Sequence, residues 1–436
     1  MKTVRLLTLT LSLCAPAAVL AGGLTDAYRQ ALESDPQLRA AEAARGALGE
    51  AGPQSLALLL PSLNLSANTT ANDVETTQSS FFPNNSEEYN SNGYNLTLTQ
   101  PIYHHDYWVG LRQADATVAQ AEADYAAARQ ELIVRVATAY FDVLAAQDTL
   151  EFARAEKEAT ARQLEQAKQR FEVGLIAITD VHEAQAQYDL TVAQEIVAEN
   201  TLANTREALQ EITGQYDEAL QVLREEIPLL NPEPYNIDAW VTQARDQNLS
   251  LRAAEFSATA AREEINRQRA GHYPTLDLVA TQSNSLSHSI TGREVDSETL
   301  ALQLNVPLFA GGAVNSRTRE AHYRSEEARH RLEQTRRSVK RQTRDAYLGV
   351  LAGISRVKAL KQAVLSNEKA LEATQTGFEV GTRTIVDVLL SQRELFRAQR
   401  DYSRSRYDYL LNTFRLKQAA GSLAQTDVEA INGWLK

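Results

Sequence analysis

Leu300-Ala301-Leu302-Gln303-Leu304-Asn305-Val306, the stretch just before Pro307, places a leucine or valine at every second position. A period of two puts these apolar side chains on one face of a β-strand and the residues between them on the other. Three further segments alternate in the same way, at 62–68, 94–99 and 275–278. The sequence therefore predicts four strands with one apolar and one polar face, at about 62–71, 93–103, 274–283 and 298–308.

Between these strands the chain has long stretches without helix breakers. No glycine or proline occurs from 111 to 173, from 175 to 213 or from 382 to 420. As a helix the first stretch would be about 95 Å long at ~1.5 Å per residue, far longer than a globular helix, which indicates a coiled coil or a helical tube. Helices are predicted at 24–52, 106–173, 175–213, 237–270, 314–377 and 384–420.

The chain is a tandem duplication. Phe171-Glu172-Val173-Gly174 recurs as Phe378-Glu379-Val380-Gly381, an offset of 207 residues, and Gly214 and Gly421 are separated by the same offset. Chance does not explain matches that recur in the same order, so each half is one structural unit. The predicted organisation is a first repeat at 22–213, a linker at 214–236, a second repeat at 237–420 and a C-terminal segment at 421–436.

The first 21 residues carry an export signal. Lys2 and Arg5 precede an apolar run, and Val19-Leu20-Ala21 supplies the small residues of a cleavage site, so Met1 to Ala21 is predicted to be a signal peptide. Cys14, the one cysteine, lies inside it. An acylated lipoprotein anchor at Cys14 is the alternative, but Leu13 is bulkier than the residue such signals need.

Composition excludes several classes of function. The formal net charge is −12, which disfavours binding to nucleic acid. After the leader no run of 18 apolar residues occurs, so no transmembrane helix is predicted, whereas the half-apolar strands of a β-barrel remain compatible with the sequence. No nucleophile elbow, phosphate loop or HExxH motif is present, so neither an enzyme nor a bound cofactor or metal is predicted.

Four strands cannot close a barrel in lipid. No strand edge can stay unpaired in a bilayer, and bacterial barrels have at least about eight strands. The chain must therefore associate, with two copies giving eight strands or three giving twelve, and twelve leave more room for a pore. The alternative is a soluble sandwich, or two hairpins packed on the helices.

Several segments resemble the TolC family of outer-membrane factors, and the resemblance spans almost the whole chain after the leader. The tip sequences are GLIAITDV at 174–181 and GTRTIVDV at 381–388, and further signatures are AYFDVL at 139–144, GHYPTLDL at 271–278 and PLFAGG at 307–312. The resemblance implies a homotrimer in the outer membrane with a shared 12-strand barrel and a periplasmic α-helical barrel. It also implies an equatorial belt near 214–236 and 421–436, and partnership with a periplasmic adaptor and an inner-membrane pump of the RND, ABC or MFS type.

The resemblance also implies a gate where the helix tips converge. Asp387 matches a ring of acids facing the pore, and Leu390 replaces a second acid one turn on. Arg383 and Asp180 match residues that link neighbouring coiled coils, and Phe378 replaces a tyrosine whose hydroxyl adds a hydrogen bond there. We therefore expect a closed state that depends more on Arg383 and Asp180 and opens more easily. The residues expected to contact the adaptor are Val173, Gly174, Leu175, Val380, Gly381 and Thr382.

Each of these assignments has a simpler alternative. Asp387 would also suit a capping box with Thr384, and Arg383 would also suit a solvated charge. The two glycines are expected to adopt the left-handed conformation that ends a helix. A metal site at His104, His105 and Asp106 is disfavoured because adjacent histidines point in different directions. Nearby aromatic residues are instead expected to form an interfacial belt, and they are Tyr103, Tyr107 and Trp108.

Two other classes of function share some of these features. A periplasmic coiled-coil adaptor would have the long helices but not the four alternating strands. A barrel-anchored adhesin would function through its outer loops, for example around Phe81-Phe82-Pro83-Asn84-Asn85. The leading interpretation is a passive export duct.

Overall fold

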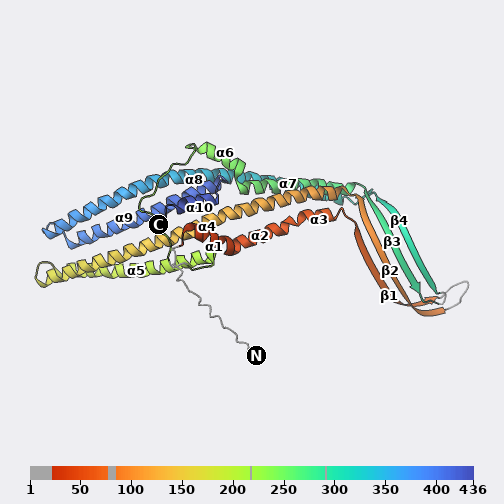
Figure 1. Ribbon diagram of the computed structural model, residues 1–436, viewed down its shortest axis with the longest axis horizontal. Helices are drawn as coiled ribbons and strands as arrows, with labels where there is room; N and C mark the ends of the chain where they lie inside the picture. Colours follow the sequence, from red (N-terminus) through yellow and green to blue (C-terminus); the bar gives the residue numbers. More distant parts are fainter. Residues whose placement is uncertain (1–21, 77–84, 217–218, 290–291) are drawn as a thin grey trace, which may run out of the picture.

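The computed structural model describes residues 22–76, 85–216, 219–289 and 292–436. The predicted leader with Cys14, and the loop residues Phe81 and Phe82, lie outside the described residues. The molecule is elongated, with long helices side by side over most of its length and a four-stranded sheet at one end (Figure 1). None of the helices in the described ranges is long and apolar enough to cross a membrane.

Two very long helices span the helical part, α4 (His105–Glu172) and α8 (Ala313–Glu379). Each turns at its far end, called here the tip, into a returning helix, α5 (Ile178–Thr213) or α9 (Ile385–Ala419). α4 contacts both α5 and α9, and α9 contacts α8, so the two hairpins form one wall. Nearer the sheet, α4 packs against shorter helices, and these are α1 (Leu24–Ser34), α2 (Pro36–Gly49), α3 (Ala51–Ala57) and α7 (Leu249–Arg269).

Two helices that the sequence predicts as continuous are interrupted. The helix expected at 24–52 breaks at Asp35, because the residue before a proline avoids the helical conformation. Asp35 then caps α2 by accepting a hydrogen bond from the Leu38 amide at 2.7 Å. The helix expected at 237–270 breaks at Asn248, between α6 (Ile237–Gln247) and α7, and Asn248 caps α7. In addition α5 begins at Ile178, not 175, because residues 174–177 form the turn.

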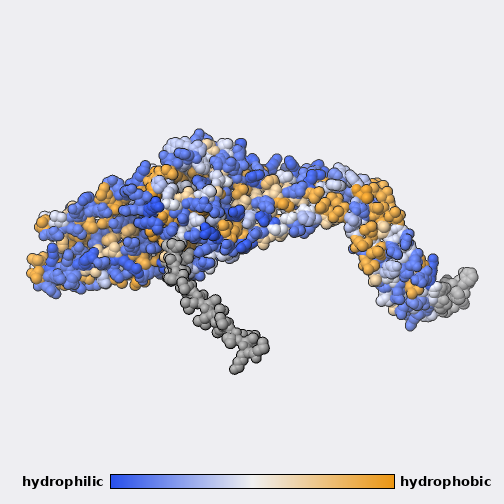
Figure 2. Space-filling view, viewed as in Figure 1, coloured by the Kyte–Doolittle hydropathy of each residue, from blue (hydrophilic) through white to orange (hydrophobic). Residues whose placement is uncertain are grey.

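The sheet has the order β1-β2-β3-β4 with every pair antiparallel, and β1 and β4 are edge strands without a partner on their outer side in the described residues. Leu63 pairs with Leu98, Leu98 with Ala280, and Ala280 with Leu300, so these residues share one face. The neighbouring row on the other face consists of Asn64, Thr97, Thr281 and Thr299. Figure 2 shows hydrophobic residues gathered on the half of the sheet nearest the helices, and hydrophilic residues beyond.

The strands extend further than the alternation predicts. They are β1 (Ser62–Thr76), β2 (Asn85–Tyr103), β3 (Thr275–Ser287) and β4 (Arg293–Asn305). Residues expected to form polar loops continue the ladder, for example in the pairing of Asn72 with Tyr89. Water can solvate both faces there, so the backbone pairs without any alternation in the side chains. At the other end β4 stops at Asn305, not 308, because Pro307 cannot donate a ladder hydrogen bond.

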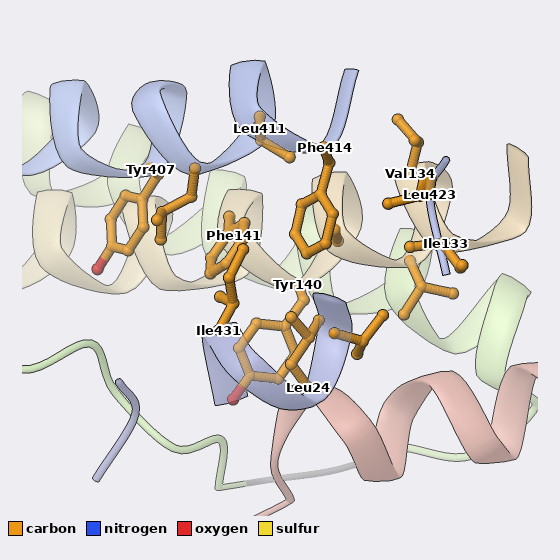
Figure 3. Packing of buried hydrophobic residues seen from close by; sticks show 14 of the residues in the cluster. Leu24, Ile133, Val134, Tyr140, Phe141, Tyr407, Leu411, Phe414, Leu423 and Ile431 are labelled. Carbon is orange, nitrogen blue, oxygen red and sulfur yellow. The ribbon is translucent and has the colours of Figure 1, made fainter. Parts of the chain in front are cut away.

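The main core lies midway along the helices. Tyr140 and Phe141 of α4 are fully buried, and they pack with Phe414 of α9 and Ile431 of α10 (Gln425–Asn432) (Figure 3). The Tyr140 hydroxyl donates a hydrogen bond to the Gln221 carbonyl oxygen at 2.8 Å, and the Gly22 carbonyl oxygen lies 3.2 Å from the same hydroxyl. The start of the described chain, part of the predicted linker and the C-terminal segment therefore gather at one level of the wall. An isolated antiparallel bridge between Leu223 and Leu435 joins the last two.

Candidate functional site at the helix tips

Both tips are built from a left-handed glycine. Gly174 has a φ of 76° and Gly381 a φ of 80°, which confirms the predicted conformation. At the first tip the Leu175 amide donates to the Arg170 carbonyl at 2.8 Å and the Gly174 amide to the Phe171 carbonyl at 2.9 Å. These are the bonds of a Schellman motif. The second tip repeats them, with the Thr382 amide donating to the Gly377 carbonyl at 2.8 Å and the Gly381 amide to the Phe378 carbonyl at 3.2 Å.

The tips present apolar side chains to solvent. Val173, Leu175 and Val380 are 70%, 72% and 70% exposed, and Thr382 is exposed beside them. Figure 2 shows hydrophobic residues at this end of the otherwise hydrophilic helices. Exposed apolar residues clustered at the end of a structure are typical of a surface that binds a partner.

Asp387 caps α9. Its carboxylate accepts hydrogen bonds from the Thr384 amide at 2.9 Å and the Thr384 hydroxyl at 3.0 Å, and the Asp387 amide approaches that hydroxyl at 3.3 Å. These hydrogen bonds, together with the Arg383 charge, lower the pKa of Asp387 below its usual value. The capping alternative is therefore present in the chain, and Leu390 one turn on is exposed. A ring of Asp387 carboxylates needs several copies of the chain, so it remains a prediction. The capping box is compatible with such a ring, because Asp387 keeps its negative charge in it.

Arg383 and Asp180 are not brought together by a single chain. Within the described residues no ion pair joins them, and each lies at its own tip. The Arg383 amide donates to the Gly377 carbonyl at 3.2 Å, and a side chain at Gly377 would collide with the Arg383 stem. The predicted link between these two residues therefore remains a prediction about neighbouring copies.

Phe378 lies in an apolar cluster that joins the two hairpins at the tip. It is 9% exposed and packs with Leu164 and Ala167 of α4 and with Ile385 and Val388 of α9. The guanidinium of Arg170, also on α4, lies 4.3 Å from the centroid of the Phe378 ring. Arg170 was not predicted to be a site residue from the sequence. A difference between the repeats could have drawn attention to it, since the position equivalent to Arg170 in the second repeat is Gly377.

Between the tip and the core the two hairpins meet through polar residues. Glu156 of α4 is 2% exposed and pairs with Arg400 of α9 at 2.9 Å. Nearer the core, Asp148 of α4 accepts hydrogen bonds from Ser403 and Tyr407 of α9. This polar seam was not predicted from the sequence, although Ser403 interrupts a heptad stripe of apolar residues in α9, with Leu389, Phe396 and Leu410 at the other positions.

Polar and aromatic residues also gather where the sheet meets the helices. His104 Nε2 lies 3.0 Å from Asp277 Oδ1, and the His104 ring stacks on Tyr107 at 4.3 Å. In the described ranges no group of three or more potential metal ligands comes together, here or elsewhere. Tyr103 and Trp108 are exposed, so an aromatic belt at this level remains a prediction.

Long paired helices joined to a sheet with open edges and one apolar face define the class of this protein, a subunit of an outer-membrane channel. The family described as "Outer membrane efflux protein" matches residues 27–215 and 240–422. The chain belongs to this family, as the tip motifs predicted.

Relatives and solved structures agree with this assignment. The chain is 43% identical to the outer membrane protein TolC of Vibrio cholerae, over 96% of this chain and 95% of that protein. It is 31% identical to the proteases secretion protein PrtF of Dickeya chrysanthemi, over 99% and 95%. Its fold matches the Campylobacter jejuni CmeC outer membrane channel with a TM-score of 0.80 and 16% identity, over 95% of this chain and 90% of that one. The predicted fold class and the outer-membrane location are confirmed.

Proposed function

We propose that the chain forms a homotrimeric duct through which cargo passes from the periplasm to the outside, without catalysis of its own. The observation that carries the proposal is the sheet, which has one apolar face and two open edges. Because an edge cannot remain unpaired in a bilayer, β1 of one copy must pair with β4 of another. Three copies supply twelve strands, and their helices then enclose a continuous conduit.

The tips are the proposed meeting point with the other components of an export system. Val173, Leu175, Val380 and Thr382, with the two turn glycines, offer an exposed surface to the helical hairpin of a periplasmic adaptor. The adaptor in turn recruits an inner-membrane pump of the RND, ABC or MFS type. The relatives include both TolC proteins and a proteases secretion protein, which supports a role in drug efflux or in type I secretion.

Reconstitution tests the duct directly. The purified protein, placed in planar lipid bilayers, should form discrete channels and should migrate as a trimer before heating. Deletion of the gene should make the cell hypersensitive to exported drugs. If the protein remains a water-soluble single chain that makes no channel, the proposal is wrong.

The gate is tested at Arg383. Replacing it with alanine removes the charge proposed to bind Asp180 of a neighbouring copy, so the resting conductance should rise. Asp180→Ala should have the same effect. The double variant should raise the conductance little further, because each single variant already removes the whole contact between Arg383 and Asp180. Unchanged conductance in both single variants would contradict this assignment while leaving the duct itself intact.

A further inference from the structure

The two repeats share the residues Phe-Glu-Val-Gly at the tip, yet their equivalent phenylalanines differ in environment. Phe378 is 9% exposed, whereas Phe171, its equivalent in the first repeat, is 41% exposed. The residue before each one differs as well, since Arg170 precedes Phe171 and Gly377 precedes Phe378. One of the positions at which the repeats have diverged thus lies directly before the two phenylalanines, and only the first repeat has a cation there.

Arg170 is placed to hold the buried ring. Its guanidinium carbon lies 4.3 Å from the centroid of Phe378, within the range of a cation–π interaction. In the described part of the chain no carboxylate forms an ion pair with Arg170, so the ring is the group that its charge meets. The reciprocal contact cannot form, because Gly377 offers no side chain to Phe171.

Gly377 has a separate role that explains why the arginine is absent there. A Cβ at this position would lie 2.7 Å from Cγ of Arg383. The second tip thus keeps room for the Arg383 side chain, while the first tip supplies the cation that reaches across. Backbone hydrogen bonds tie both partners to their turns, since Arg170 accepts from Leu175 and Phe378 accepts from Gly381.

We propose that Arg170 is a positioning residue of the gate: through the Phe378 ring it holds the second hairpin against the first in the resting channel. The assignment rests on the proposed duct and names a contact within one subunit. It complements the proposed link between Arg383 and Asp180, which joins neighbouring subunits. It also gives Phe378 a partner that does not require the hydroxyl of a tyrosine.

Single-channel recording with matched variants tests the proposal. Arg170→Gln should shift the equilibrium toward the open state by about two- to fivefold, the range expected for one cation–π contact. Phe378→Leu should shift it at least as far, because it also removes packing from the apolar cluster. The double variant should match Phe378→Leu, because Arg170 then has no ring to hold. Arg170→Lys should stay near the wild type, because an ammonium also binds a ring face. Two controls should leave the conductance unchanged: Phe171→Leu, the equivalent exposed ring, and Arg162→Gln, an exposed arginine on the same helix.

A second readout follows the hairpins themselves. Spin labels on cysteines introduced at Val173 and Val380 should report a broader distance distribution between the tips in the Arg170→Gln variant than in the wild type. If Arg170→Gln behaves like Arg162→Gln in both measurements, or if Phe171→Leu opens the channel as much as Phe378→Leu, the contact does not position the gate. Those outcomes presuppose wild-type channels, so they are distinct from a wild type that forms none, which would overturn the duct.

Discussion

Gly421 and Gly381 share a left-handed backbone, with φ angles of 77° and 80°, but their surroundings differ. A Cβ at Gly381 would meet nothing, whereas at Gly421 it would overlap the backbone carbonyl of Gln247. Gly381→Ala should therefore cost about 1–2 kcal/mol for the left-handed conformation alone. Gly421→Ala adds a steric clash with rigid backbone and should lower the thermal unfolding midpoint clearly further. Equal midpoints for the two variants would refute this account.

Single residues could be predicted from the sequence where a local rule decides their conformation. Gly174, Gly381 and the capping box of Thr384 with Asp387 each follow from a few neighbouring residues. The contact of Arg170 with Phe378 could not be predicted in this way, because it depends on how two helices from different repeats pack. A sequence pattern gives the face on which a side chain lies but not its distant neighbour.

Among the elements, α4 and α9 meet through a buried ion pair between Glu156 and Arg400. Glu156 is 2% exposed, so Arg400→Ala would leave its charge buried without a partner and should cost about 3–5 kcal/mol of unfolding free energy. Replacing both residues, with Glu156→Leu and Arg400→Met, should recover part of that loss, since no buried charge then remains. Denaturant unfolding of the purified protein measures all three.

The matched control is an exposed ion pair on α4, the helix that carries Glu156. Arg162 and Glu158 form an exposed ion pair, with side chains 64% and 72% exposed, so Arg162→Ala should change the unfolding free energy by less than about 0.5 kcal/mol. If Arg400→Ala proves as mild as this control, the pair is not effectively buried.

Helices and strands could be predicted as elements because their periods and breakers persist over many residues, while their ends could not. The break at Asp35 depends on the proline that follows it, and the break at Asn248 on a cap whose side chain also donates to the Ala419 carbonyl of α9 at 3.0 Å. Beyond the apolar band, the strands continue through polar residues such as Asn72 and Tyr89, where no alternation marks them. Each difference between the predicted and the observed ends arises where tertiary contacts or solvent, not the local sequence pattern, determine the structure.

At the scale of the whole molecule, the two faces of the sheet should tolerate charge very differently. Leu302 lies on the apolar face with Leu300 and Leu304, and Ala301 lies on the polar face that would line the pore. Leu302→Arg should cost about 2–4 kcal/mol per copy at the middle of a bilayer, and the loss is repeated in every copy of the assembly. Ala301→Arg should be tolerated, because its charge meets water. The amount of heat-resistant trimer in outer-membrane fractions measures both, and equal yields would mean that the faces are assigned the wrong way or that the sheet does not face lipid.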